Sequence, residues 1–407
     1  MELADEQDKT LEVEIERLLP GGVGLAHAEG LTLFVSLAAP GDVVRVRVDR
    51  VQGKLGFASI VEIVNPSTVR VEPPCPYFGL CGGCDFQQLT YEAQLNAKVD
   101  IIRDCLHRIA KIEPREIPII PSPNEWRYRA RAMWQVDALR SRLGYFVRGS
   151  NEVCDVEYCA VLVPELQQRL EQVRNEISAE SDPPLKAIEA VAGDDGVSTV
   201  SHPPNRARFP GKEVSRVIGG ETYCFSAEGF FQINHQLLKP LIAEALCDIP
   251  LVVKEVGVSG TAIDLYCGVG LFTLPLARRF ARVVGVEANE RATKFARRNL
   301  EFANLSNAQV VTARVGDWLK QHSRSFGQVE FLLLDPPRTG AENKDIAGML
   351  ALRPTRISYV SCDPATLARD LKKLINAGYS LDSIVAFDMF PQTHHVETVA
   401  RLSTVDL

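Results

Sequence analysis

Several features are scarce or missing in this sequence, and each absence narrows the possibilities. No uninterrupted apolar run approaches about 18 residues, so a membrane-spanning helix is not expected. Residues 1–10 are acidic and contain no apolar core, which argues against a secretory signal. With 46% hydrophobic and 24% charged residues, the 407-residue chain has the composition of a globular protein of roughly two or three domains. We therefore expect a globular protein of the cytoplasm.

A surplus of basic residues is also missing, because the formal net charge is −7. This value is unusual for a nucleic-acid-binding protein, since neutralisation of phosphates usually dominates affinity. Binding needs only one basic face, however. Between residues 126 and 148 the chain concentrates arginine and aromatic side chains: Arg127, Arg129, Arg131, Arg140, Arg142 and Arg148 with Trp126, Tyr128, Trp134, Tyr145 and Phe146. This mixture suits phosphates and stacked, unpaired bases, whereas the alternative is a strand pair with solvated arginines and buried aromatics.

The chain has ten cysteines, and they are unevenly spread. In a cytosolic protein such a number argues against a disulfide framework and in favour of metal binding or catalysis. Cys75, Cys81 and Cys84 form one group, and Cys154 and Cys159 form a second. These five residues are therefore candidates for a metal site.

The order of predicted elements divides the chain into a β unit, a mixed central part and an α/β part. Residues 11–66 show short alternating strands separated by Gly and Pro turns, a pattern typical of a five-stranded OB-like barrel. Residues 91–111 have helical apolar spacing, residues 114–123 form a Pro-rich linker, and residues 125–226 are mostly β with one helix near residues 164–177. From residue 261 onward strands alternate with helices, which predicts a parallel, doubly wound, Rossmann-like sheet.

A glycine-containing turn follows the first of these strands, at residues 264–270. Such a turn lets the backbone approach a ligand at a helix N-terminus. Thr273 stands where a dinucleotide fingerprint has its third glycine, which weakens an NAD interpretation. Asp264, Glu287 and Asp317 lie near the ends of successive strands. Three acidic groups would repel a phosphate-bearing cofactor but would accept adenosine attached to a sulfonium cation, as in S-adenosylmethionine.

Two further strand ends carry chemically useful side chains. Asp335 is followed by Pro-Pro and then by Arg338, where enzymes that methylate amino groups carry an aromatic residue that stacks on the base. Methylation of an exocyclic amine is therefore disfavoured. Cys362 ends the next strand and precedes a helix, a position that favours a thiolate. The alternative for an isolated cysteine is an inert, buried side chain.

Cys362 is accompanied by Glu397, which lies in the segment PQTHHVE near the end of the chain. Carbon 5 of uracil is a poor nucleophile, but addition of a thiolate to C6 gives C5 carbanion character. After methylation a general base must remove the C5 proton before the thiolate can leave. One cysteine, one carboxylate and one sulfonium donor would together meet these requirements.

The motifs in the second half of the chain resemble those of the RNA uracil-C5 methyltransferase family. They are FFQIN (residues 230–234), DLYCGVG (264–270), LLDPPRTG (333–340), VSCDP (360–364) and PQTHHVE (391–397). The resemblance implies that Cys362 is the nucleophile and Glu397 the base. It also implies contacts with S-adenosylmethionine from a set of residues that includes the turn glycine: Gln232, Tyr266, Gly268, Glu287, Asp317 and Asp335.

The first part of the chain is similar to two features of the 23S rRNA branch of that family. Residues 1–66 resemble a TRAM domain, which is an OB-like RNA-binding module. The spacing of Cys75, Cys81 and Cys84, together with Cys159, resembles a four-cysteine [4Fe-4S] site. Zinc is the chemical alternative for four cysteines, and Cys154 is an alternative fourth ligand. The spacing does not match the radical S-adenosylmethionine signature, so we expect a structural cluster.

These features imply three domains and an RNA partner. The expected boundaries are residues 1–66 for the TRAM domain, 67–90 with 120–228 for the iron–sulfur domain, and 91–119 with 229–407 for the methyltransferase domain. The resemblance implies that the protein forms 5-methyluridine in 23S rRNA, because the tRNA branch of the family it resembles lacks both the TRAM domain and the cluster. We also expect a monomer. Three alternatives stay open: the same chemistry on a tRNA uridine, a redox-responsive RNA-binding protein with an inactive transferase domain, and DNA cytosine-C5 chemistry, whose nucleophile normally sits in a different loop.

Overall fold

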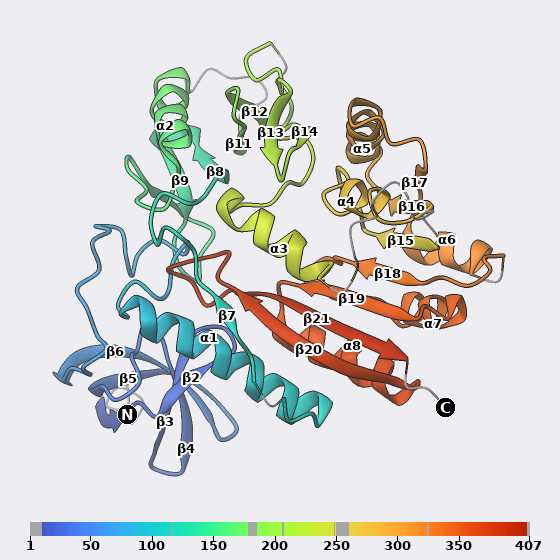
Figure 1. Ribbon diagram of the computed structural model, residues 1–407. Helices are drawn as coiled ribbons and strands as arrows, with labels where there is room; N and C mark the ends of the chain where they lie inside the picture. Colours follow the sequence, from blue (N-terminus) through green and yellow to red (C-terminus); the bar gives the residue numbers. More distant parts are fainter. Residues whose placement is uncertain are drawn as a thin grey trace.

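The computed structural model describes residues 10–114, 116–177, 185–205, 207–247, 249, 260–323 and 325–404 (Figure 1). Residues 1–9, which form the acidic start of the expected TRAM domain, lie outside the described residues. In Figure 1 the N-terminal sheet, the central part and the large C-terminal sheet occupy three regions, and helix α1 runs between the first and the last. Among the described residues, no helix combines the length and the apolar character needed to cross a bilayer.

Residues 10–65 form one six-stranded sheet in the order β1-β5-β6-β4-β3-β2, where the sequence predicted five strands. The sequence analysis missed β3, because this strand does not alternate between apolar and polar residues. Its Gly24 packs so closely that an added Cβ would lie 2.8 Å from the Cβ of Ala38. Alternating side chains such as Leu33, Val44 and Val46 fill the core of the sheet. The strands are β1 (Thr10–Glu14), β2 (Arg17–Leu19), β3 (Val23–Ala28), β4 (Leu31–Val35), β5 (Val43–Gln52) and β6 (Leu55–Asn65).

The predicted helix after the cysteine loop is present as α1 (Tyr91–Cys105), followed by a π-helical turn at Leu106–Ala110. Thr90 caps its start by accepting a hydrogen bond from the backbone N–H of Ala93. One face of α1 packs on the N-terminal sheet through Ala97 and Ile101, and its C-terminal end packs against the C-terminal sheet through other residues. This helix therefore connects two parts that are distant in the sequence.

The predicted linker at residues 114–123 is partly wrong, because it contains a strand. β7 (Ile119–Ile120) pairs in parallel with the end of β20 (Tyr379–Phe387) and extends the C-terminal sheet by one strand. The backbone N–H of Asp388 also donates to the carbonyl of Ile120, at 2.9 Å. Two residues are too short for a periodic signal, and the neighbouring prolines concealed the strand.

The central part is mostly β, as the sequence predicted. Its five-stranded sheet has the order β10-β9-β8-β11-β12, helix α2 covers it, and β13 and β14 form a separate hairpin. Trp134, Leu166 and Leu170 are buried in its core. The elements are β8 (Arg131–Asp137), a 3₁₀ turn (Ala138–Arg140), β9 (Arg142–Phe146), β10 (Val153–Asp155), α2 (Pro164–Glu176), β11 (Ala187–Ala192), β12 (Val197–His202), β13 (Val214–Ile218) and β14 (Glu221–Phe225).

The C-terminal sheet has eight strands in the order β17-β16-β15-β18-β19-β21-β20-β7. The prediction of a purely parallel sheet is wrong in one respect, because β21 runs antiparallel to both β19 and β20. The strands after β14 are β15 (Thr261–Leu265), β16 (Arg282–Glu287), β17 (Ala308–Thr312), β18 (Phe331–Leu334), β19 (Arg356–Ser361), β20 (Tyr379–Phe387) and β21 (Glu397–Thr404).

Helices cover both faces of this sheet, and each face has its own apolar core. Leu241 of α3, Leu274 of α4 and Phe295 of α5 belong to one core, whereas Leu319 of α6 and Leu371 of α8 belong to the other. The helices are a 3₁₀ turn (His235–Leu237), α3 (Leu238–Ala245), α4 (Thr273–Ala277), α5 (Glu290–Phe302), α6 (Val315–His322), α7 (Asn343–Leu352) and α8 (Pro364–Asn376). The alternation of strands and helices predicted from residue 261 is confirmed.

A buried ion pair joins α1 to the segment between β20 and β21. The side chains of Lys98 and Asp388 are both 0% exposed, and their charged groups are in contact. The ammonium of Lys98 also donates to the carbonyl oxygen of Phe390, at 3.1 Å. Burial lowers the pKa of Lys98, and the charge of Asp388 opposes that change. The pair therefore depends on both partners being present.

We predict that Lys98→Met destabilises the fold by about 3–5 kcal/mol, because it leaves the Asp388 carboxylate buried without its cation. Lys344→Met is the matched control, since Lys344 pairs with Glu342 on the surface and such pairs contribute about 0–1 kcal/mol. The midpoints of urea unfolding of the two variants should be compared with that of the unmodified chain. Equal midpoints for both variants would contradict this account of the buried pair.

Candidate active site

The strand order brings the predicted site residues to one edge of the C-terminal sheet. Parallel strands end at the same edge, which is where ligands bind in open α/β sheets. Tyr266, Glu287, Asp335 and Cys362 lie at or directly after the ends of β15, β16, β18 and β19. Because β21 is antiparallel, its first residue, Glu397, lies at this same edge. Residues separated by more than 130 positions in the chain are thereby collected in one place.

The glycine turn after β15 has the conformation that its sequence requires. Tyr266 and Gly268 both have positive φ, 62° and 54°. The N–H of Gly268 donates to Glu287 at 3.1 Å, and the other carboxylate oxygen of Glu287 accepts from the N–H of Asn289 at 2.7 Å. The hydroxyl of Tyr266 donates to Asp345 on α7 at 2.7 Å. Glu287 thus joins the turn to the start of α5.

Thr273, in the place of the third glycine, has a structural partner that the sequence analysis did not foresee. Its hydroxyl donates to the carboxylate of Asp264 at 2.5 Å, inside the core. Burial raises the pKa of Asp264 to about 8, although the bond from Thr273 lowers it. Asp264 is therefore directed into the protein, and it is not available to a ligand in the way the three-acid argument supposed.

Gln232 and Asp335 come from positions 103 residues apart and are joined directly. The side-chain amide of Gln232 donates to the Asp335 carboxylate at 3.3 Å. Burial raises the pKa of Asp335 to about 7, and the bond from Gln232 opposes this shift. Asp317 lies in the first turn of α6 and is exposed. Five of the six predicted cofactor residues lie at or after the carboxyl ends of β15, β16, β17 and β18, and Gln232 reaches the same edge from the segment before α3.

Burial is the main influence on the thiol of Cys362. It raises the pKa of this thiol to about 12, and the carboxylates of Glu397 and Asp335 raise it further, whereas Arg338 lowers it. Burial and these acidic neighbours thus oppose the thiolate that the position before a helix is expected to favour.

Glu397 is also deeply enclosed. Its side chain is 2% exposed, and Oε1 has no hydrogen-bond partner among the described residues. Burial and the charge of Asp335 raise the pKa of Glu397 well above its usual value, whereas Arg338 lowers it. Burial, His394 and Arg338 also lower the pKa of His395 to about 3. The neutral His395 ring lies 3.4 Å from the Arg338 guanidinium.

Residues 388–396, here called the catalytic loop, connect β20 to Glu397 and are held from three directions. Gln94 of α1 exchanges hydrogen bonds with Gln392, at 3.0 and 2.9 Å. The buried hydroxyl of Tyr128 donates to the carbonyl of Pro391 at 2.8 Å. Asp85, next to Cys84, accepts from the N–H of His394 at 2.8 Å and from its ring. The sequence analysis missed Gln94, Lys98, Asp85 and Asp388, because no local pattern distinguishes them from other polar residues.

The predicted cysteine ligands lie together around one pocket. Cys75, Cys81, Cys84 and Cys159 all line it, whereas Cys154 is buried in β10 and does not. Burial raises the pKa of Cys81 to about 11 and that of Cys84 to about 12. Within the described part of the chain, no group of three or more His, Cys, Asp or Glu side chains has an arrangement that could hold a metal ion. The grouping is thus established, and a metal-binding geometry is not.

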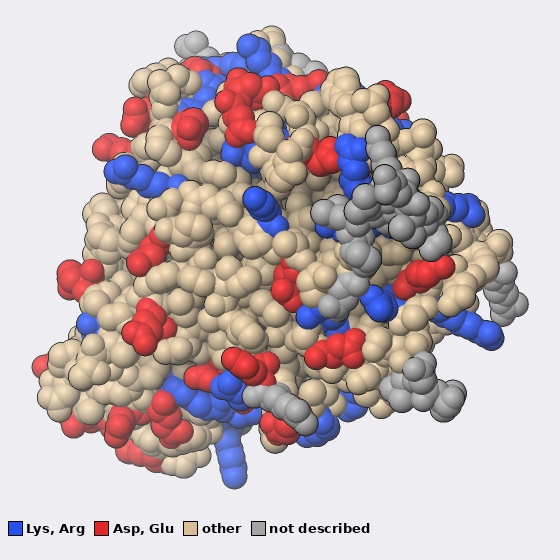
Figure 2. All heavy atoms as spheres, viewed as in Figure 1, with Lys and Arg blue, Asp and Glu red and all other residues tan. Residues whose placement is uncertain are grey.

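The arginine-rich stretch forms a less continuous surface than predicted. Arg129 lines the cysteine pocket, and Arg131 pairs with Glu189 beneath the ring of Phe230, which is 60% exposed. Arg127, Arg140 and Arg142 are exposed. On the face drawn in Figure 2, basic and acidic side chains of the described residues are interspersed. The buried aromatics Tyr128 and Trp134 belong to the core, as the alternative interpretation held.

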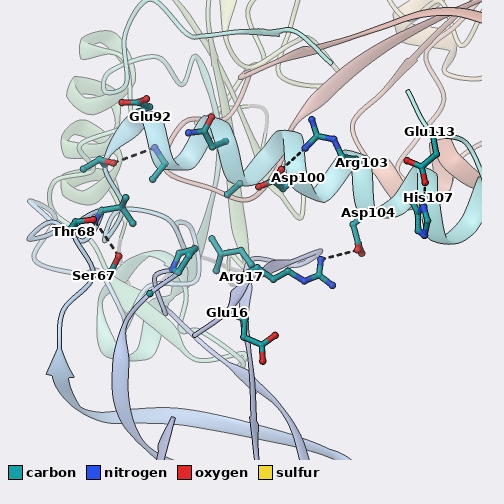
Figure 3. Close-up of a pocket in the computed structure, with 18 residues that line it drawn as sticks. Glu16, Arg17, Ser67, Thr68, Glu92, Asp100, Arg103, Asp104, His107 and Glu113 are labelled. Carbon is teal, nitrogen blue, oxygen red and sulfur yellow. Dashed lines mark hydrogen bonds and ion pairs between the residues drawn. The ribbon is translucent and has the colours of Figure 1, made fainter. Parts of the chain in front are cut away.

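A separate groove of about 940 Å³ lies between the N-terminal sheet and α1 (Figure 3). Arg17 crosses it and pairs with Asp104 at 2.9 Å. Its charged lining residues are mainly acidic: Glu16, Glu92, Asp100, Asp104 and Glu113 against Arg17 and Arg103. Phosphates would be repelled there, so this groove is not assigned to the site described above.

Fold and site together define a class: an α/β methyltransferase with an N-terminal β module and ionisable groups at the carboxyl edge of its sheet. Residues 216–405 match the model of the tRNA (Uracil-5-)-methyltransferase family, and residues 6–61 match the TRAM domain. The chain belongs to the RNA uracil-C5 methyltransferase family and is therefore an enzyme that uses S-adenosylmethionine. This confirms the resemblance, the methyltransferase fold and the TRAM module.

Individual relatives cover almost the whole chain. A 23S rRNA (uracil(1939)-C(5))-methyltransferase RlmD from Pectobacterium atrosepticum is 33% identical, over 96% of this chain and 93% of its own length. An uncharacterized RNA methyltransferase from Aquifex aeolicus is 32% identical, over 98% of this chain and 100% of its own. The crystal structure of Pyrococcus abyssi tRNA (uracil-54, C5)-methyltransferase in complex with S-adenosyl-L-homocysteine superposes with a TM-score of 0.71 and 25% identity, covering 96% of this chain and 100% of that one.

Proposed function

We propose that this enzyme methylates C5 of a uridine in 23S rRNA through a covalent adduct between Cys362 and C6 of the base. The observation that carries the proposal is the register of β19 with β21. Ser361 pairs with Thr398 in this register, so the next residue of one strand, Cys362, lies opposite the previous residue of the other, Glu397. The nucleophile and the base required by the chemistry thereby face one reaction site.

The side chains would act in a fixed order. The thiol of Cys362 first loses its proton to water, and the resulting thiolate forms a bond to C6 while the electrons of the C5–C6 double bond move toward O4. S-adenosylmethionine supplies the methyl group from its sulfonium centre, and C5 forms the new bond. Glu397 then removes the proton from C5, the C5–C6 double bond forms again, and the Cys362 sulfur leaves with the electrons of its bond to C6.

The buried charges of the site suit this order. Cys362 loses its proton at a cost while Glu397 and Asp335 are both ionised, because their charges raise the pKa of its thiol. A cation bound near Asp335 weakens this repulsion and leaves the Glu397 carboxylate available as the later base. The raised pKa of Glu397 also makes its carboxylate a stronger base for the later proton removal. The same acidic surroundings thus hinder the first step and favour the last one.

Gln232, Tyr266, Gly268, Glu287, Asp317 and Asp335 are proposed to hold the cofactor, as the family resemblance implied. Their position at the carboxyl edge of the sheet supports this role for the strand-end residues. Asp335 is a group that a sulfonium cation would stabilise in its ionised form, since burial raises its pKa to about 7. Tyr266 would contribute its ring, because its hydroxyl is bonded to Asp345.

The choice of 23S rRNA rests on the relatives named RlmD, which align along nearly their whole length. A tRNA uridine is the second candidate, and one observation favours it: the Pyrococcus abyssi structure, of an enzyme named for a tRNA uracil, covers 96% of this chain. An enzyme named for tRNA can therefore share nearly the whole architecture, which removes the argument that the tRNA branch lacks the N-terminal module. Mass mapping of 23S rRNA and tRNA from a deletion strain would decide between the two.

The other proposals concern organisation. Residues 1–66 would bind RNA, residues 67–90 with 120–228 would form the cysteine-containing domain, and residues 91–119 with 229–407 would carry the chemistry, in a monomer of the cytoplasm. The inactive-transferase alternative is disfavoured, because Cys362 and Glu397 are both present and adjoin each other. The DNA cytosine alternative is disfavoured by the family match.

The four cysteines are proposed to hold a structural [4Fe-4S] cluster. All four cysteines line one pocket, although they come from two distant segments of the chain. An inert, buried cysteine would not be expected to lie in such a group. Zinc is the chemical alternative, because it too is bound by four cysteines, and the metal content of the purified protein distinguishes the two. The reaction is a polar methyl transfer and needs no electron from the cluster.

Cys362→Ala should reduce methylation of RNA by at least about 1,000-fold, since the residue acts as a unit with its base in forming the adduct. Binding of S-adenosylmethionine, measured by calorimetry, should stay within about twofold, because the thiol contacts the uracil. Cys105→Ala, at a buried cysteine of α1, is the matched control and should retain activity. Undiminished turnover by Cys362→Ala would contradict the covalent mechanism.

Glu397→Gln should permit the addition and methyl-transfer steps and block removal of the C5 proton. Turnover should decrease by about 100- to 10,000-fold, the usual contribution of a general base. A denaturing gel of enzyme, RNA and S-adenosylmethionine should show a covalent protein–RNA band with this variant. The band should disappear in the double variant Glu397→Gln/Cys362→Ala. A variant with normal turnover and no band would exclude the proposed base.

Anaerobically purified protein should be brown and contain about four iron atoms per chain, if the four cysteines hold the proposed cluster. Cys81→Ser should lose iron, whereas Cys154→Ser should retain it, because Cys154 does not line the pocket. Colourless protein with one zinc ion per chain would overturn the cluster and leave the uracil chemistry unaffected. If Cys154→Ser lost iron and Cys159→Ser retained it, Cys154 would replace Cys159 as the fourth ligand.

A further inference from the structure

The turn between β2 and β3 packs directly on the catalytic loop. Gly21 and Gly22 lie in this turn, and both have positive φ, 89° and 74°. A Cβ added at Gly22 would lie 3.0 Å from the Cβ of His394 and 3.2 Å from Oδ2 of Asp85. A Cβ added at Gly21 would meet nothing within 4 Å. The N-terminal sheet thus reaches the loop that leads to Glu397, at a point where only a glycine fits.

Asp85 and His394 form a two-point contact beside this turn. Nδ1 of His394 donates to Oδ2 of Asp85 at 2.5 Å, and the backbone N–H of His394 donates to Oδ1 at 2.8 Å. A carboxylate only accepts hydrogen bonds, so the contact fixes both the proton on Nδ1 and the orientation of the ring. The next residue, Phe86, is 0% exposed and shares a core with Leu18 and Ala39 of the N-terminal module. The pair is therefore anchored to that module.

The ring of His394 covers the ring of His395. Their centroids lie 4.1 Å apart, and the ring of Phe390 meets His395 edge-on at 5.9 Å. Nε2 of His395 lies 3.4 Å from the guanidinium of Arg338. A guanidinium has only donors, so the imidazole accepts in this contact. The position of the His395 ring, enclosed by two neighbouring rings, thus determines where Arg338 finds its acceptor.

Arg338 matters because of the groups that surround the nucleophile. Burial raises the pKa of the Cys362 thiol, and Glu397, Asp335 and Asp363 raise it further, whereas Arg338 lowers it. Arg338 also lowers the pKa of Glu397, against burial and the charge of Asp335. A guanidinium that moved away would leave the thiolate among acidic groups without this compensation.

We propose that Asp85 and His394 are positioning residues, which hold the His395 ring against Arg338, and that the turn at Gly22 keeps them in place. The inference rests on the proposed function, because the Cys362 thiolate is the species that Arg338 assists. It assigns the N-terminal module a second task besides RNA binding. All of these contacts are made within the chain, so the inference does not depend on a group bound at the cysteines.

The first test measures alkylation of Cys362 by iodoacetamide in the full chain without RNA, followed by mass spectrometry of the peptide that contains Cys362. Alkylation reports the thiolate, so His394→Ala and Asp85→Ala should each slow it about threefold. The double variant should be no slower than either single variant, because the two residues act as one unit. Asp85→Asn, which keeps an acceptor for the N–H of His394, should lie between Asp85→Ala and the unmodified chain.

Matched controls separate this role from a general disturbance of the fold. His107→Ala should alkylate at the unmodified rate, because His107 forms the same kind of pair with Glu113 on the surface. Gly22→Ala should slow alkylation as His394→Ala does. Gly21→Ala has a similar backbone cost but no contact with the loop, and its alkylation rate should match that of the unmodified chain.

The second test measures turnover on 23S rRNA from a deletion strain. His394→Ala should lower kcat about 10-fold and leave KM for RNA within about twofold, since the pair acts on the nucleophile and does not touch RNA. A change in KM alone would contradict a positioning role.

The outcomes separate this inference from the proposed function. An active unmodified enzyme, with alkylation and kcat unchanged in both His394→Ala and Asp85→Ala, would overturn the inference alone. An unmodified protein that methylates neither 23S rRNA nor tRNA would overturn the proposed function, and alkylation would still decide whether the pair positions Arg338. If His394→Ala cannot be obtained in soluble form, His394→Asn carries the test. It keeps a donor for Asp85 but lacks the ring, so alkylation at the unmodified rate would refute the proposal.

Discussion

The antiparallel insertion of β21 between β19 and β20 is the constraint on which the site depends. A parallel strand in that place would begin at the opposite edge of the sheet, and Glu397 would then be remote from Cys362. The register fixes the pair further, because a shift by one residue would turn Glu397 to the other face of the sheet. The direction and register of β21 therefore determine the position of the proposed base, and the catalytic loop only connects β20 to it.

Bringing these strand ends together has an electrostatic cost, since two carboxyl groups and one thiol are placed where little water reaches them. The pKa values of Asp335, Cys362 and Glu397 are all raised, and burial is the largest cause in each case. Proton release from any one of them makes release from the others harder. Arg338 is the cation that opposes this effect, and the neutral ring of His395 lies beside it. Burial thus favours the protonated forms of these groups, and a cationic cofactor would favour their ionised forms.

The sequence allowed the alternation of strands and helices, helix α1 and the grouping of the four cysteines to be predicted, because each follows from a local pattern or from a motif. It could not reveal β7 or β3, since a two-residue strand and a strand containing Gly24 carry no period. It also placed Asp264 at the cofactor, whereas Thr273 binds that carboxylate inside the core. The supports of the catalytic loop were invisible for a different reason. Lys98 and Asp388 are 290 residues apart, and their pairing is decided only by tertiary packing.

The cysteine loop and the catalytic loop are mechanically connected, which gives a structural cluster a reason to exist in an enzyme whose reaction needs no electron. The N–H groups of Asp85 and Phe86 both donate to the carbonyl of Gln392, at 3.1 and 3.0 Å. The loop that contains Cys84 is in turn bonded to the end of β9, through Arg148 and the carbonyl of Cys84. A group that binds Cys84 and Cys159 would therefore fix both Asp85 and the segment that carries Tyr128, because the neighbouring Arg129 is bonded to Val161, just after Cys159. These are two of the three supports of the catalytic loop, so a cluster there would stiffen the segment that presents Glu397 without taking part in the chemistry.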